Sequence, residues 1–177
     1  TCVLYSIINC IERQFGIDIH EKYAEGEVDR FAKEGRVDKS KGAIGIRLLN
    51  GLKVRPLCGY KIKDFTKIWS KKKRPSPNDL QKIRDAMING QVILMFDSRG
   101  KSPLIKLNER HVMVPYTTPI APGGHAVAVM DYNEKTRRYE LENSWSDTWG
   151  NSGYFYLKEE DLKSEVGEVF TIIFAKI

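Results

Sequence analysis

A cysteine near the start of the chain, together with a histidine and an asparagine in its last third, has the side-chain chemistry of nucleophilic catalysis. The stretch GGHAVAVMDYNEKTRRYELENSW runs from Gly123 to Trp145, with His125 before one apolar run and Asn143 after the next. An asparagine oxygen that accepts a hydrogen bond from one ring N–H fixes the imidazole tautomer and leaves the other nitrogen to act as a base. A thiol that meets this nitrogen becomes a nucleophile, and Cys2 is the candidate.

The residues around this histidine and asparagine predict a β-hairpin. Residues 125–132 form a largely apolar run, apolar and polar residues alternate over 137–143, and turn-forming residues lie between the two segments. A turn centred on Glu134 would place three pairs of residues opposite each other: His125 with Asn143, Val127 with Leu141, and Val129 with Tyr139. Opposite residues lie about 4.5–5.5 Å apart at Cβ, so we expect His125 and Asn143 to touch.

Among the three cysteines, Cys2 is the expected nucleophile because it lies in the first turn of a predicted helix. Unpaired N–H groups and the helix dipole stabilise a thiolate there, and a neighbouring imidazolium lowers the thiol pKa from about 8.5 to roughly 3.5–7.5. Cys10 lies two turns further along the helix, and Cys58 lies in an irregular stretch. No CxxC motif or Cys/His metal spacing is present, so we expect neither a metal ion nor an organic cofactor.

Helical patterns dominate the first half of the chain and strand-like patterns the second. A buried amphipathic helix is predicted over residues 2–15, ending near Gly16. Further helices are predicted over 27–35, over about 43–52, and up to about 89, the last capped by Asn78 or Asp79 and closed by Gly90. Strands are predicted at 91–97, 126–132, 137–143, 153–157 and 168–175. Helices followed by strands predict an α+β fold with a mostly antiparallel sheet or partial barrel.

The length of 177 residues fits one globular domain, residues 1–177, with one well-buried core. No apolar run approaches the roughly 18 residues of a membrane-spanning helix. The net charge is +6, and the basic segment WSKKKRPSP (69–77) is expected to be a solvated connection, with nucleic-acid binding unlikely. Three cysteines cannot all pair within the chain, which favours a reducing, intracellular compartment; nothing else in the sequence indicates a location.

Three segments resemble the papain-like cysteine peptidases. TCVLYSIINCIE is similar to the family's nucleophile helix and carries the nucleophile to Cys2. GGHAV matches the segment of the general base and carries that role to His125. ENSWSDTWGNSGYFYL resembles the family's Asn-Ser-Trp-Gly signature, which implies that Asn143 orients the imidazole and that Trp145 shields the site.

The resemblance implies a two-lobed fold, with a helical lobe over about 1–75, a β-rich lobe over about 76–177 and the active-site cleft between them. In SKGAIGIRLL, Gly42 would offer backbone hydrogen bonds to an extended peptide, and Gly124 would belong to the same substrate-binding region. The implied reaction is hydrolysis of peptide bonds in a peptide or protein substrate through a thioester acyl-enzyme.

The chain also departs from the family pattern. Val3 replaces the usual tryptophan after the nucleophile, and Ser146 replaces the glycine of the Asn-Ser-Trp-Gly motif. Only Thr1 precedes Cys2, so the family's upstream oxyanion-hole glutamine has no counterpart, and we expect the N-terminal part of the domain to be truncated. The missing glutamine and Val3 leave open a catalytically impaired papain-like binding domain. The alternative among enzymes is a cysteine acyltransferase of the transglutaminase-like type, which would more often orient the histidine with an aspartate than with Asn143. His111 is an alternative base, although nothing in the sequence pairs with it.

Overall fold

A computed structural model describes residues 2–37, 45–70, 76–99, 105–115 and 120–177 of the chain. Its helices are α1 (Cys2–Phe15), α2 (Glu21–Lys33), α3 (Gly45–Val54), α4 (Pro77–Asn89) and α5 (Leu162–Glu165), with a 3₁₀ turn at Glu159–Asp161. Its strands are β1 (Tyr60–Ser70), β2 (Gln91–Arg99), β3 (Ile120–Asn133), β4 (Arg138–Glu142), β5 (Tyr154–Lys158) and β6 (Val166–Lys176).

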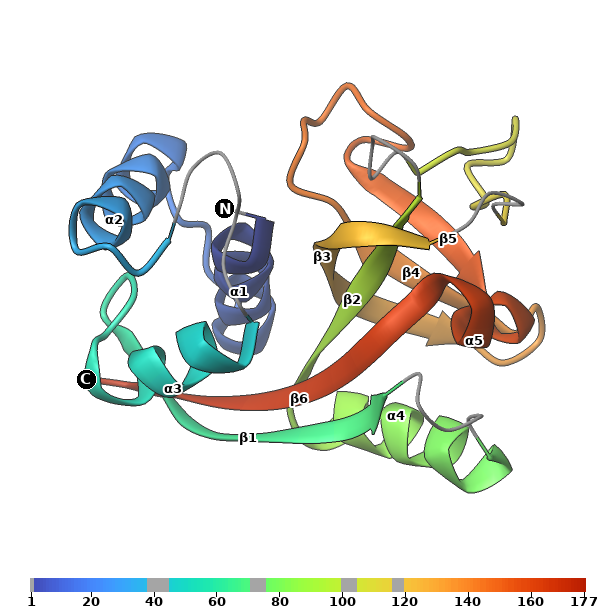
Figure 1. Cartoon of the computed structure of the whole chain (residues 1–177), viewed down its shortest axis with the longest axis horizontal. Helices are drawn as coiled ribbons and strands as arrows, with labels where there is room; N and C mark the ends of the chain where they lie inside the picture. The colour runs from blue at the N-terminus through green and yellow to red at the C-terminus, as the bar shows by residue number, and fades with distance from the viewer. Residues whose placement is uncertain (1, 38–44, 71–75, 100–104, 116–119) are drawn as a thin grey trace.

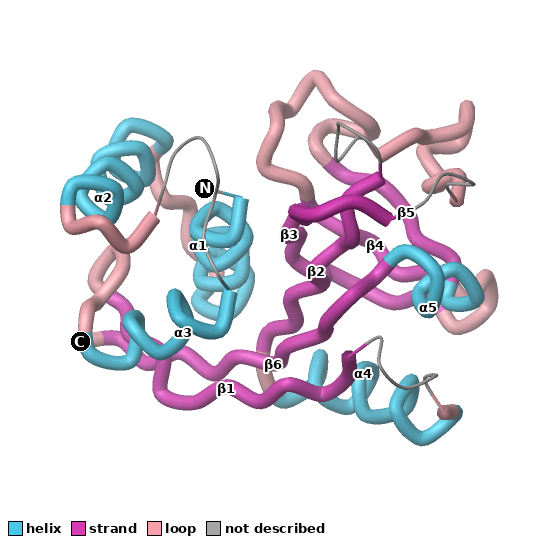
Figure 2. Tube along the Cα trace, viewed as in Figure 1, coloured by secondary structure: helices cyan, strands magenta, loops and turns pink. Residues whose placement is uncertain are grey.

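The strands form one antiparallel sheet in the order β1-β6-β2-β3-β4-β5. Helices α1, α2 and α3 gather at one end of the molecule, β3, β4 and β5 lie at the other, and the long strands β1 and β6 run along both (Figures 1 and 2). This arrangement confirms the predicted α+β fold. The division into lobes near residue 75 stays a prediction, since β1 precedes it and pairs with β6.

Strands β2 and β3 separate two hydrophobic clusters because alternate residues of a strand point to opposite faces of the sheet. Ile93, Ala126 and Ala128 pack into a cluster with α1, α2 and α3. Leu94 and Val127 pack into the other, together with residues of α4, β4 and β5. Both strands are therefore apolar on both faces, which explains their nearly continuous apolar sequences.

Helix α1 forms where the sequence predicts it. Leu4, Ile7 and Ile11 recur at helical spacing and are fully buried against the sheet. The helix ends at Phe15, and Gly16 follows at φ +61°, a left-handed conformation that glycine adopts without a steric penalty.

Among the described residues, no helix is both long and apolar enough to span a membrane.

The start of α4 differs from the prediction, because Ser76 caps the helix instead of Asn78 or Asp79. The Ser76 side chain accepts from the Asp79 backbone N–H, and the Asp79 carboxylate accepts from the Ser76 backbone N–H, which forms a capping box. Pro77 follows at the first helical position, where its missing N–H has no helical partner to lose. Gly90 closes the helix as predicted.

The predicted register of the β3–β4 hairpin is wrong. Val129 pairs with Leu141 instead of Tyr139, and Tyr139 pairs with Tyr132. The turn is longer than predicted because the Asn133 side chain accepts from the Thr136 N–H and Arg137 adopts a positive φ of 50°. A bulge between Val129 and Asp131 shifts the pairing once more.

Two further elements differ from the sequence analysis. Helix α2 begins at Glu21 instead of near residue 27, because the His20 ring accepts a hydrogen bond from the Lys22 N–H and caps the helix. Strand β1 was not predicted. It lies at the edge of the sheet, carries charged residues on its exposed side, and has irregular pairing between Ile62 and Asp64 that interrupts the alternation.

Glu159 joins three elements at the far end of the hairpin. Its carboxylate, in a residue only 4% exposed, accepts from Arg84 of α4, from Tyr132 of β3 and from Arg137 of the turn before β4. Burial raises the pKa of this carboxyl, but hydrogen bonds from Arg137 and Tyr132 and the charges of both arginines outweigh burial and lower it. Glu159 therefore holds the helix, the strand and the turn together as an anion.

We predict that Glu159→Gln lowers the free energy of unfolding by about 2 kcal/mol at pH 7, since it leaves Arg84 without its buried partner. A carboxylate with a lowered pKa stabilises the fold above its ordinary value of 4.5 and loses this effect as the pH falls through the folded-state value. Urea unfolding at pH 7 and pH 3 measures the difference, which should shrink in acid. The matched control is Glu160→Gln, because that side chain is 74% exposed. An equal effect of both variants would contradict the prediction.

Candidate active site

His125 and Asn143 meet as predicted, although not as an opposite pair of the hairpin. His125 Nε2 lies 2.7 Å from Asn143 Oδ1, and both residues are buried, each 5% exposed. Strand β4 ends at Glu142, which pairs with Ala128. The two side chains therefore reach each other diagonally at the end of the hairpin. The predicted contact is confirmed even though the predicted register is wrong.

A second hydrogen bond to Asn143 fixes the tautomer of His125. The backbone N–H of Ser144 donates to Asn143 Oδ1 over 2.9 Å, so this side-chain atom is an acceptor and hence the carboxamide oxygen. Nε2 of His125 must then carry the proton that it donates to the same oxygen. Consequently Nδ1 is the nitrogen left for a further partner. The Asn143 backbone N–H donates to Gly153 O over 2.9 Å and anchors the residue.

The thiol of Cys2, the first residue of α1, is the further partner of the His125 ring. Burial raises the pKa of this thiol, but the hydrogen bond to His125, the charge of the imidazolium and a hydrogen bond from the Ala126 backbone N–H outweigh burial and lower the pKa to about 7. A substantial fraction of Cys2 is therefore thiolate at neutral pH. The structure brings together the three residues that the sequence analysis selected, from α1, from β3 and from the segment after β4.

The pKa values of the other two thiols are raised instead of lowered. Burial raises the pKa of Cys10, which lies inside α1, far above its ordinary range. Burial and the charges of Glu27 and Glu12 raise the pKa of Cys58 to about 12. All three cysteines are free thiols, and Cys2 is the one of the three whose pKa is lowered.

Aromatic side chains cover the imidazole. The Trp145 indole lies against the His125 ring, with centroids 5.0 Å apart, and remains 38% exposed. Trp149 packs edge-on against Trp145 at 5.0 Å and against Phe155 at 5.4 Å. Trp145 thus packs against His125 on one side and remains partly open to solvent.

Ser146, which replaces the family's glycine, has a local structural role. Its hydroxyl lies 2.7 Å from the Thr148 hydroxyl, and it accepts from the Thr148 N–H over 3.2 Å. These bonds order the turn that connects Trp145 with Trp149. The replacement therefore leaves the aromatic cover in place.

Of the two glycines assigned to substrate binding, Gly124 and Gly42, the structure describes only Gly124. Gly124 is exposed and comes directly before His125, and a Cβ on it would lie 2.6 Å from the Phe96 carbonyl oxygen. Glycine there allows β2 and β3 to approach closely beside His125. Gly42 lies outside the described residues, as does the basic run 71–74.

The sequence analysis missed an acidic pair beside the site. Glu142, next to Asn143, and Glu12 of α1 line a pocket of about 350 Å³ together with Arg13, Asp18 and Tyr154. Burial and the negative charge of Glu12 raise the pKa of Glu142 to about 7, against the opposing effect of a hydrogen bond from Tyr154. A pair of like charges from distant segments leaves no local signal in the sequence. Within the described residues, no group of three or more His, Cys, Asp or Glu side chains is arranged to hold a metal ion.

Comparison with protein-family models gives a match over residues 8–171 to the family described as papain family cysteine protease. The matched segment contains His125 and Asn143 and begins after Cys2. An uncharacterized peptidase C1-like protein of Acanthamoeba polyphaga mimivirus is 30% identical over 95 residues. That match covers 49% of this chain and 30% of the viral protein, so the chain spans about a third of its length.

Solved structures of cysteine proteases share the fold. Xylellain from Xylella fastidiosa superposes with a TM-score of 0.61 at 17% identity, over 97% of this chain and 78% of xylellain. Bromelain from Ananas comosus in complex with E64 superposes with a TM-score of 0.59 at 13% identity, over 97% and 87% of the two chains. A Carica candamarcensis cysteine protease in complex with E-64 gives 0.53 at 16% identity, over 77% and 71%.

We predict that Glu142→Gln stabilises the fold at pH 8 by about 1 kcal/mol, a value reduced for partial solvent screening. The folded state holds a proton on Glu142 up to about pH 7, whereas an ordinary glutamate loses it near 4.5, so stability falls as the pH rises between these values. Glutamine cannot ionise, so the variant does not lose this stability as the pH rises. Urea unfolding at pH 4 and pH 8 should show the gain at pH 8 alone. An equal gain at both pH values would assign the effect to packing instead of ionisation.

Proposed function

The chain belongs to the papain family of cysteine proteases, and we propose that it hydrolyses peptide bonds with Cys2 as nucleophile, His125 as general acid and base, and Asn143 as the residue that orients the imidazole. The observation that carries the proposal is the shared acceptor Asn143 Oδ1, which takes the proton of His125 Nε2 and leaves Nδ1 for the thiol. The lowered pKa of Cys2 to about 7 supports it.

Acylation begins from the thiolate of Cys2 and the imidazolium of His125. The sulfur attacks the carbonyl carbon of the scissile bond and forms a C–S bond, and the carbonyl oxygen becomes an oxyanion. The Cys2 backbone N–H, in the first turn of α1, is the donor that we assign to this oxyanion. As the C–N bond breaks, Nδ1 of His125 protonates the leaving amine, and a thioester remains.

Deacylation uses the same groups in reverse. Neutral His125 takes a proton from water at Nδ1, and the resulting hydroxide attacks the thioester carbon. The C–S bond breaks, the acid leaves, and the thiolate–imidazolium pair returns. Asn143 keeps the ring in one tautomer throughout, since Nε2 donates to Oδ1 in both charge states of the imidazole.

The proposed substrate is a peptide or protein segment in extended conformation. Gly124 is exposed beside His125, so the backbone there is accessible to an extended peptide. On the strength of the family resemblance, we also assign Gly42 the role of offering backbone hydrogen bonds to the extended peptide. Trp145 is proposed to shield the His125–Asn143 bond.

We predict that iodoacetamide alkylates Cys2 with a pH midpoint of about 7, because that is the pKa of its thiol. His125→Ala removes the hydrogen bond and the charge that lower this pKa but leaves burial, so the midpoint should rise to about 8.5 or higher. Mass spectrometry of tryptic peptides identifies the labelled cysteine. His111→Ala is the control, because His111 is the other candidate base. Equal labelling of all three cysteines would favour a binding domain that keeps the fold without the chemistry.

We predict that Asn143→Ala lowers kcat for a peptide substrate by about 10²-fold with little effect on KM, because the imidazole loses its orientation but the thiol remains. Cys2→Ala should abolish hydrolysis. The pH profile of kcat/KM should also change for Asn143→Ala, which a purely structural defect would not produce. Wild-type protein that labels at Cys2 without cleaving any peptide library would refute hydrolysis, and products joined to an added amine would identify an acyltransferase.

A further inference from the structure

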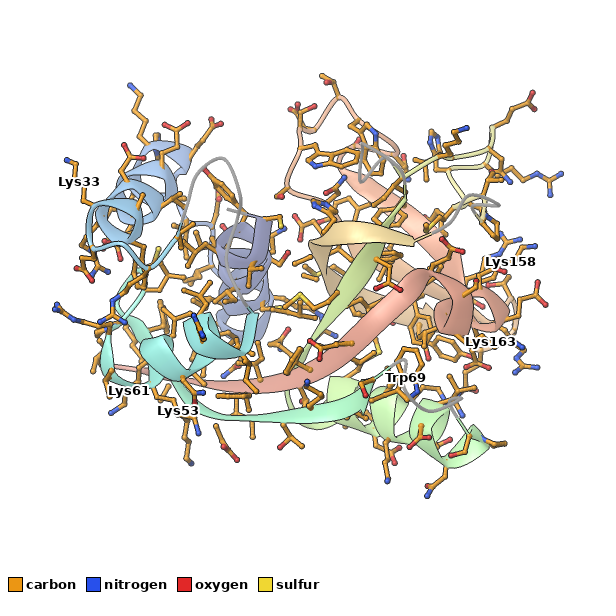
Figure 3. The ribbon with its side chains drawn as sticks, in the orientation of Figure 1. Lys33, Lys53, Lys61, Trp69, Lys158 and Lys163 are labelled. Carbon is orange, nitrogen blue, oxygen red and sulfur yellow. The ribbon has the colours of Figure 1, made fainter. Side chains whose placement is uncertain are left out.

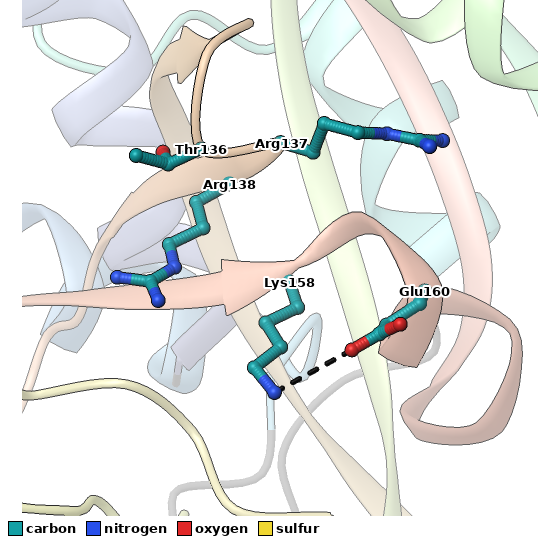
Figure 4. Close-up of a pocket in the computed structure, with 5 residues that line it drawn as sticks. All are labelled: Thr136, Arg137, Arg138, Lys158 and Glu160. Atoms are coloured by element: carbon teal, nitrogen blue, oxygen red, sulfur yellow. Dashed lines mark ion pairs between the residues drawn. The ribbon is translucent and has the colours of Figure 1, made fainter.

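Two cations lie directly opposite each other across β4 and β5, at the end of β4 that is farther along the chain from Asn143. Arg138, the first residue of β4, pairs with Lys158, the last residue of β5. Like charges at opposite positions of a sheet repel each other. The two side chains project to the same side of these strands (Figure 4). A compensating negative charge would remove this repulsion.

The neighbouring carboxylate compensates only in part. Lys158 Nζ lies 3.4 Å from Glu160 Oε1, and these side chains are 45% and 74% exposed, so water screens the pair. Arg138 forms no ion pair with any residue that the structure describes, and its Nε is buried without a hydrogen-bond partner. A buried charged donor without an acceptor is unfavourable, and an anion bound to the guanidinium would offset its positive charge.

Arg138, Lys158 and the exposed carboxylate of Glu160 line a pocket of about 300 Å³ together with Thr136 and Arg137. The Arg137 guanidinium extends away from the other two cations (Figure 4) and binds Glu159. The pocket therefore presents the Arg138 guanidinium and the Lys158 ammonium as its two cationic groups with no buried acceptor.

Arg138 also lines a second pocket, of about 330 Å³, with the carboxylates of Asp131 and Glu140. Asp131 accepts from the Tyr132 N–H over 2.8 Å, and Glu140 accepts from the Tyr156 hydroxyl over 3.2 Å. Both carboxylates have hydrogen-bond donors of their own, and neither forms an ion pair with Arg138. They moderate the charge of Arg138 but leave its Nε proton unpaired.

We infer that the pocket between Arg138 and Lys158 binds a tetrahedral oxyanion, namely a phosphate or sulfate group. The planar guanidinium fork matches two oxygens of such a group, and the lysine ammonium supplies a point charge to a third. The pocket exceeds the size of one such group, so it also accommodates a phosphate monoester. Binding at this site requires neither Cys2 nor the proposed hydrolysis.

Nuclear magnetic resonance titration of the whole chain with inorganic phosphate tests the inference, with ionic strength held constant by sodium chloride. We expect saturable shifts of the backbone amides of residues 136–138 and of Lys158. Arg138→Gln and Lys158→Gln should each weaken binding by about tenfold or more, and Arg138→Lys should restore only part of the affinity because it lacks the fork. Titration with O-phosphoserine shows whether a free anion or a phosphorylated side chain binds better.

Lys163→Gln is the matched control, because this exposed lysine projects from α5 on the same part of the molecule as Lys158 but does not line the pocket (Figure 3). It should bind phosphate like the wild type. Shifts that rise linearly without saturation, or equal affinity of Arg138→Gln and the wild type, would overturn the inference. Should Arg138→Gln fail to fold, Lys158→Gln decides the question by the same criteria.

Discussion

The oxygen of one buried carboxamide determines the geometry of the candidate site. Asn143 Oδ1 accepts from the Ser144 N–H and from His125 Nε2. The bond from Ser144 identifies the atom as the oxygen, and therefore shows that His125 Nε2 carries the proton in the other bond. A backbone N–H can only donate, so the atom that it meets is oxygen, and the ring nitrogen on the same atom carries hydrogen. The orientation of the imidazole follows from this one acceptor, and the imidazole is one of the groups that lower the pKa of Cys2. Asn143 Nδ2, in contrast, is buried without a partner among the described residues, which costs about 1–3 kcal/mol. Stability alone does not explain an asparagine there.

The sheet supplies the rigidity that this arrangement requires. Alternate residues of β3 pack into different hydrophobic clusters, Ala126 and Ala128 toward α1 and Val127 and Val129 toward β4 and β5. A shift of β3 by one residue would exchange both sets, so burial on two faces fixes its position strongly. His125 begins this doubly buried segment, and the close approach of Gly124 to Phe96 O fixes the backbone just before it. The ring therefore lies on a strand whose position is fixed by burial on both faces.

Much of this was readable from the sequence, and the failures have identifiable causes. Apolar spacing predicted α1 and the doubly buried strands because burial decides both. The contact between His125 and Asn143 was predicted from a register that is wrong. The contact forms nevertheless, because polar side chains at a strand end reach diagonal as well as opposite positions. Ser76 was missed as a cap because two later residues had the same propensity, and β1 because charged residues on an exposed edge hide its alternation. Glu12 and Glu142 come together only through tertiary structure, which no local pattern reports.

The two cysteines of α1 show why residue type alone does not identify the nucleophile. Cys2 and Cys10 lie on the same helix, and burial raises the pKa of both. At Cys2 this effect is reversed by a ring from β3 and by the Ala126 N–H, both brought to the helix start by packing between α1 and the sheet. At Cys10, Arg13 is the one charge that favours the thiolate, and it also holds Met130 O and Gln91, so desolvation prevails. The lowered pKa of the Cys2 thiol thus depends on the interface between helix and sheet more than on the helix that carries it.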